Sequence, residues 1–66
     1  MNKKAIGQKL KELRGDKTMQ EVASAVGISQ SAVSMYEHGE RVPSDNIKKL
    51  LAKYFNTTVE NIFFAE

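Results

Sequence analysis

The sequence between residues 18 and 38 reads TMQEVASAVGISQSAVSMYEH. It predicts two short helices, one starting at Thr18 and one running from Gln30 to His38. Thr18 opens a capping box: its hydroxyl accepts a hydrogen bond from the amide of Glu21, and the Glu21 side chain reaches back. Ser29 is a good N-cap for the second helix. Because only three residues separate the helices, they must turn sharply and pack against each other.

The residue types at three positions of this segment meet the steric requirements of a sharp turn between two packed helices. Ala23 is small enough for the point where the two helices cross, and Gly27, four residues later, tolerates the positive φ of a tight turn. Val33, six residues further on, is a β-branched core residue facing back from the second helix. These offsets meet the steric needs of a helix-turn-helix, which we place at residues 19–38.

Three further helices are expected around this pair. The first runs from Lys3 to Arg14, the next from its N-cap Ser44 through Phe55, and a short last one follows residues 56–58. Apolar residues recur in them at helical spacing: Ile6, Leu10 and Leu13; then Ile47, Leu50, Leu51 and Tyr54; then Val59, Ile62 and Phe63. No stretch alternates with period two, so the predicted fold is all-α, a compact five-helix bundle.

The composition limits the class of protein. A chain of 66 residues has room for one domain, residues 1–66, with a single core. It has no cysteine, and its one histidine, His38, has no second ligand candidate, so we expect no metal and no cofactor. Without a glycine-rich phosphate loop or a close carboxylate pair, an enzyme is not expected. No apolar run approaches the roughly 20 residues of a membrane span; we expect no membrane contact and a cytoplasmic protein.

Basic residues gather near the start of the chain, although the net charge is only +2. The first 17 residues contain Lys3, Lys4, Lys9, Lys11, Arg14 and Lys17 against Glu12 and Asp16. Two interpretations are open. The charges form a solvated helix face, or, beside an element that reads nucleic acid, they form a flank that faces phosphates.

Several motifs together resemble a known family. They are IGQKL at residues 6–10, QEVASAVGISQS at 20–31, YEHGERVP at 36–43 and NTTVE at 56–60. In this combination the sequence resembles the Cro/C1-type (Xre-like) helix-turn-helix regulators, which include phage repressors. The resemblance covers nearly the whole chain and implies a lambda-repressor-like DNA-binding domain.

The resemblance implies that the third helix lies in the major groove of double-stranded DNA. Gln30 and Ser31 match its base-reading positions, and Ser34 and Met35 lie one turn further on. The chemistry is suitable: glutamine can bond adenine N7 and N6, serine can donate or accept, and methionine can contact a thymine methyl. In the alternative interpretation, Gln30 and Ser31 are only a polar helix start and Met35 packs in the core or in a dimer.

The resemblance also implies a set of phosphate contacts. The start of the second helix points at a phosphate in such domains, which suits its free amides. The family often has glutamine where this chain has Met19, so only the Met19 amide can serve here. The residues implied as phosphate-binding are Thr18, Met19, Arg14, Tyr36, His38, Arg41, Ser44 and Asn46.

A pair of charged residues matches an ion pair found in relatives. Arg14 and Glu37 are expected to tie the first helix to the end of the recognition helix; the alternative is two unrelated surface charges. Glu37 therefore joins Ala23, Gly27, Val33 and Gly39, which closes the third helix, as a structural residue.

The implied function is transcriptional regulation, most often repression, by a homodimer bound to a pseudo-palindromic operator. We expect Phe63 in the core and Phe64 exposed at the dimer seam, and no small-molecule effector domain. The rival hypothesis is a protein-interaction module on the same fold, such as an antitoxin or an antirepressor-like partner. Short polar residues at the start of the third helix, Gln30 and Ser31, favour DNA, whereas Met35 slightly favours the rival.

Overall fold

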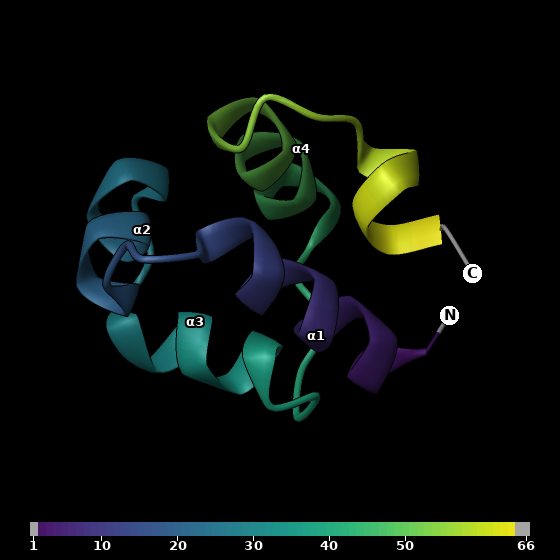
Figure 1. The fold of residues 1–66 in the computed structure, drawn as a ribbon, viewed down its shortest axis with the longest axis horizontal. Coiled ribbons are helices and arrows are strands. Elements are labelled where there is room, and N and C mark those ends of the chain that lie inside the picture. Colours follow the sequence, from purple (N-terminus) through teal and green to yellow (C-terminus); the bar gives the residue numbers. More distant parts are fainter. Residues whose placement is uncertain (1, 65–66) are drawn as a thin grey trace.

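The computed structural model describes residues 2–64, which form five helices (Figure 1). They are α1 (Lys3–Arg14), α2 (Met19–Val26), α3 (Gln30–Glu37), α4 (Asp45–Tyr54) and a short π-helical segment, η1 (Glu60–Phe64). Residues 2–64 contain no strand, so the predicted all-α class is confirmed. In Figure 1, α3 lies on one side of α1, and α4 and η1 lie on the other.

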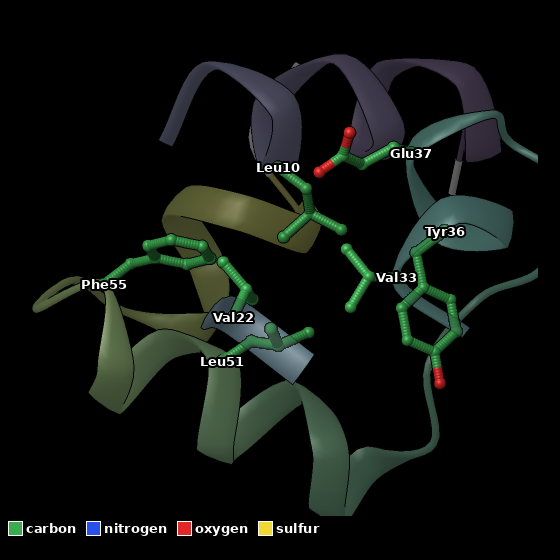
Figure 2. Close-up of a pocket in the computed structure, with 7 residues that line it drawn as sticks. All are labelled: Leu10, Val22, Val33, Tyr36, Glu37, Leu51 and Phe55. Atoms are coloured by element: carbon green, nitrogen blue, oxygen red, sulfur yellow. The ribbon is translucent and has the colours of Figure 1, made fainter. Parts of the chain in front are cut away.

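One hydrophobic core joins the five helices. Its buried apolar side chains are Ile6, Leu10, Val22, Ala23, Val26, Val33, Tyr36, Leu51, Ala52, Ile62 and Phe63. The centre of this core encloses a cavity of about 10 Å³, between Leu10, Val22, Val33, Tyr36, Leu51 and Phe55, with Glu37 at its edge (Figure 2). A space of that size holds about one water molecule at most, so it is a packing gap and not a ligand site.

The expected buried face of α4 is partly wrong. Leu50, placed in the apolar stripe, is 39% exposed, whereas Lys48 is buried beside Leu51 and Ala52. The Lys48 ammonium lies 5.6 Å from the ring centre of Phe63 and 5.5 Å from that of Phe64. These cation–π contacts fasten η1 to α4. The helix is therefore rotated toward η1, which turns Leu50 outward.

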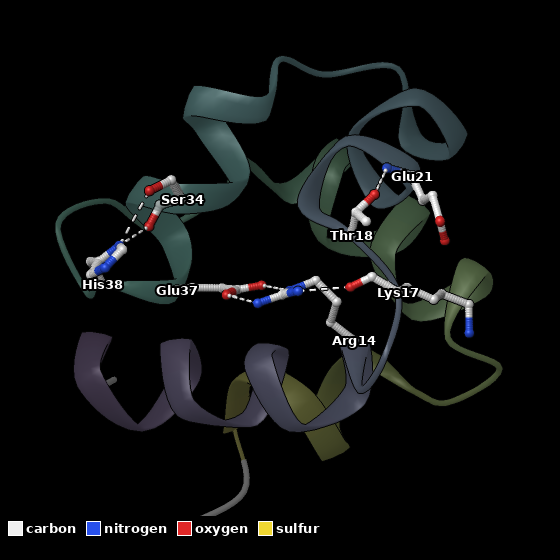
Figure 3. A network of polar contacts seen from close by, with 7 residues as sticks. All are labelled: Arg14, Lys17, Thr18, Glu21, Ser34, Glu37 and His38. Carbon is white, nitrogen blue, oxygen red and sulfur yellow. Dashed lines mark hydrogen bonds and ion pairs between the residues drawn. The ribbon is translucent and has the colours of Figure 1, made fainter.

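Side-chain caps fix where the helices begin. Thr18 accepts from the Glu21 amide at 3.0 Å, and Ser29 accepts from the Ala32 amide at the same distance. The return bond of the capping box at α2 is not formed in the part of the chain that the structure describes. The Glu21 carboxylate points away from the start of the helix (Figure 3), so a single hydrogen bond caps α2.

The crossing of α1 and α3 depends on Gly7, a residue for which the sequence pattern predicts no structural role. A methyl group at Gly7 would lie 2.7 Å from the carbonyl oxygen of Tyr36 and nearer still to that of Glu37. Carbon and oxygen atoms do not approach this closely without strain, so only glycine permits the observed distance between the two helix backbones. This crossing sets the position of α3 on the surface.

Candidate nucleic-acid interface

The helix-turn-helix is built from α2, α3 and the three residues between them. Gly27 is left-handed, with φ of 84°, and its amide and that of Ile28 both donate to the Ala23 carbonyl, at 2.8 and 2.9 Å. Ala23 and Val33 are only 1% and 4% exposed. The turn is thus closed by backbone hydrogen bonds and the two helices meet through buried small side chains, which holds α3 at a fixed angle to α2.

The start of α3 presents polar side chains to solvent. Gln30 and Ser31 are exposed, and Ser34 and Met35, one turn later, are half-buried. The Ser29 hydroxyl caps the helix. Within the part of the chain that the structure describes, the side chains of Gln30 and Ser31 make no hydrogen bond, so they are free to bind a ligand. The end of α3 that would enter a groove first is therefore also its most accessible and most polar part.

The last turn of α3 is held by His38. Its Nδ1 donates to the Ser34 carbonyl oxygen at 2.7 Å and lies 3.3 Å from the Ser34 hydroxyl (Figure 3). A hydrogen on Nδ1 leaves Nε2 as the acceptor of the neutral ring. The ring therefore packs along α3. It links Ser34, which the family resemblance implies contacts bases, to His38, which the resemblance implies contacts a phosphate.

Arg14 lies at the junction of α1, α3 and the loop before α2. Its Nε donates to Glu37 Oε2 at 2.7 Å and its Nη2 to Oε1 at 3.1 Å, while Nη1 donates to the Lys17 carbonyl oxygen at 2.7 Å (Figure 3). The hydrogen bonds to Glu37 raise the pKa of Arg14 above its ordinary value. The side chains of Arg14 and Glu37 are 16% and 4% exposed, so this is a semi-buried, two-point ion pair.

The start of α2 offers main-chain donors. The first amides of a helix have no partner within it, and here they follow Lys17 and Thr18, both exposed. The side chain of Met19 packs against the core. A ligand at this position can therefore use the Met19 amide and the Thr18 hydroxyl, whose oxygen already accepts from Glu21 but whose hydrogen can still be donated.

The segment after α3 separates core residues from exposed ones. Tyr36 is 7% exposed, and its hydroxyl points away from the central cavity (Figure 2). Arg41, Ser44 and Asn46 are exposed, and Ser44 accepts from the Ile47 amide at 3.4 Å as the cap of α4. In this segment, Arg41 is therefore the cationic side chain that is accessible to solvent.

No group of three or more histidine, aspartate or glutamate side chains in residues 2–64 is arranged to hold a metal ion. No helix among these residues has the length and apolar character needed to cross a membrane.

The chain is similar to known proteins in sequence and fold. A family model described as helix-turn-helix (HTH_3) matches residues 10–62. The restriction-modification controller protein C.AhdI from Aeromonas hydrophila is 29% identical, with a TM-score of 0.82 over 91% of this chain and 94% of that one. The clp gene regulator ClgR from Corynebacterium glutamicum is 24% identical, with a TM-score of 0.85 over 97% of this chain and 70% of that one. No curated protein matches the sequence significantly.

Proposed function

We propose that this chain, which belongs to the Cro/C1-type helix-turn-helix family of DNA-binding transcription regulators, is a sequence-specific repressor. It acts as a homodimer that binds a pseudo-palindromic operator with α3 of each protomer in the major groove. Since it acts on DNA, we place it in the cytoplasm of a bacterium. C.AhdI and ClgR are described as a controller and a gene regulator, which supports the regulatory role.

The observation that carries this proposal is the exposed polar start of α3. The major groove is about 12 Å wide and admits an α-helix, whose diameter with side chains is about 10–12 Å. Gln30 can bond the N7 and N6 of adenine at two points, and Ser31 can donate or accept beside it. Ser34 and Met35 are half-buried and reach the base edges only if α3 lies deep in the groove.

Groups on both sides of α3 are suited to backbone phosphates. At one side lie the Thr18 hydroxyl and the Met19 amide, at the positive end of α2. At the other lie Arg41, Ser44 and Asn46. The His38 ring and the Tyr36 hydroxyl have smaller roles, and Arg14 acts chiefly through its bonds to Glu37 and Lys17. Such contacts supply affinity and orientation, whereas the start of α3 supplies specificity.

Selection from a random duplex library at about 0.15 M salt tests the proposal. We expect an enriched inverted repeat with half-sites about 34–36 Å apart. Gln30→Ala should weaken binding to it by about 5- to 150-fold, the equivalent of roughly 1–3 kcal/mol, and relax the preference at one base pair in each half-site. Lys53→Ala, at the exposed end of α4, is the control and should change neither the affinity nor the base preference. If no duplex is enriched, the protein-interaction hypothesis takes first place.

A dimer is proposed through the end of the chain. Phe64 is 55% exposed at η1, next to Phe63, which is buried at 2%. Phe64→Ala should shift the sedimentation equilibrium from dimer toward monomer and remove the cooperativity of operator binding. Leu50→Ala, which truncates the other large exposed apolar side chain, should leave both unchanged. Unchanged sedimentation of Phe64→Ala would place the seam elsewhere.

A further inference from the structure

The first turn of α1 packs against the turn that follows α3. Asn2 caps α1 by accepting from the amides of Lys4 and Ala5, at 3.0 and 3.2 Å, which fixes the start of the helix at Lys3. A side-chain carbon at Gly39 would lie 3.3 Å from both Cα and Cγ of Lys4. Gly39 is also left-handed, with φ of 73°. The backbones of the two segments are therefore in contact.

This contact gathers cationic side chains that are far apart in the sequence. Lys3 and Lys4 lie beside Gly39 and are exposed, and Arg41, two residues after Gly39 in the chain, is exposed as well. In the described part of the chain, none of the three has an acidic partner. Glu40 is the one carboxylate within this group, so the local balance is three positive charges against one negative, or +2.

The two ends of α1 lie beside different parts of the helix-turn-helix. At its start is Gly39, two residues before Arg41, and at its end Arg14 donates to the Lys17 carbonyl just before α2. With 12 residues, α1 is about 18 Å long. That length spans a major groove of about 12 Å together with the backbone at its edges. Cations at the two ends of α1 therefore lie at a spacing suited to the two strands of one groove.

We propose that Lys3 and Lys4 each bind a DNA backbone phosphate on the side of the groove opposite the start of α2. This inference rests on the proposed function and adds α1 to its contact surface. Lys3 and Lys4 extend the patch of Arg41, so that α3 is held in the groove from both ends. The contact is to phosphate, so it strengthens binding to every sequence alike.

The test is the salt dependence of binding to the selected operator, measured by fluorescence anisotropy between about 0.05 and 0.2 M salt. The slope of log K against log salt is negative, and each lost phosphate contact lowers its magnitude by about 0.9. The double variant Lys3→Gln/Lys4→Gln should therefore lower it by about 1.8 per bound protomer, with the base preference unchanged. Glutamine at position 4 keeps the Cγ that lies beside Gly39, so the fold is preserved, which thermal unfolding checks.

The matched control is Lys53→Gln, at the end of α4 on the far side of α1 from α3, which should leave the slope unchanged (Figure 1). An unchanged slope in the double variant, with wild-type protein still selecting an operator, overturns this inference alone. A changed base preference with an unchanged slope also overturns it. Wild-type protein that binds no duplex overturns the proposed function and this inference with it.

Discussion

Replacing Gly7 with alanine should destabilise the domain by about 2–3 kcal/mol, although alanine is the better helix former. In an open helix the change would gain about 1 kcal/mol. Here the added methyl group would meet the carbonyl oxygens of Tyr36 and Glu37, which belong to the backbone and cannot rotate away. Overpacking typically costs 1–3 kcal/mol and sometimes more. Because the obstacle here is rigid backbone, we expect the cost at Gly7 to lie at or above the upper end of that range.

The effect should reach DNA binding as well as stability. To admit the methyl group, α3 must move away from α1, which lengthens the Arg14–Glu37 bonds and tilts the start of α3. Urea unfolding followed by circular dichroism gives the stability, and binding to the selected operator gives the function. Gly27→Ala is the control: this glycine has φ of 84° but nothing within 4 Å of an added carbon. The free energy of unfolding of Gly27→Ala should be about 1–2 kcal/mol lower than that of the wild type, from backbone strain alone. If Gly7→Ala were as stable as wild type, the close approach of the α1 and α3 backbones at Gly7 would be wrong.

Local signals in the sequence predicted most of the fold. The observed bounds of α1, Lys3–Arg14, are those expected, and α2, α3 and α4 begin directly after the expected caps at Thr18, Ser29 and Ser44. A cap and an apolar stripe act within one or two turns of chain, so they can be read without knowing the tertiary structure. The all-α class followed from the same patterns.

What the sequence could not predict depends on contacts between distant helices. Gly7 lies inside a regular helical pattern, and its only local sign is an unfavourable helix propensity. The outward rotation of Leu50 follows from the burial of Lys48 against Phe63 and Phe64, a contact between α4 and η1 with no signal in either segment.

Some features of the candidate site could likewise be predicted from the sequence, and others could not. The exposure of Gln30 and Ser31 follows from their place beside the cap of α3, and so it could be predicted. Arg14 and Glu37 are 23 residues apart, and only the family resemblance indicated that they pair. Lys3 and Lys4 lie beside Gly39, two residues before Arg41, because a residue without a side chain admits α1 there, and no pattern in the sequence indicates this contact.

The ion pair of Arg14 with Glu37 should show a strong asymmetry between its two partners. Arg14→Met leaves a carboxylate that is 4% exposed with no cation, and removing one partner of a buried pair costs about 3–5 kcal/mol. Glu37→Met leaves a guanidinium that is 16% exposed and still bonded to the Lys17 carbonyl. It should cost about 1–2 kcal/mol, closer to the cost of losing a single hydrogen bond.

The double variant Arg14→Met/Glu37→Met should recover most of the loss, because a well-packed apolar pair often replaces a buried ion pair without destabilisation. The Glu37 position borders the small apolar cavity lined by Leu10 and Val33, so a methionine there has apolar surface to contact. Urea unfolding of the four proteins gives a coupling free energy, which we expect to be about 2 kcal/mol or more. Additive losses, or equal losses in the two single variants, would show that solvent screens the pair. In that case α3 would be held in place by the Gly7 crossing and the core alone.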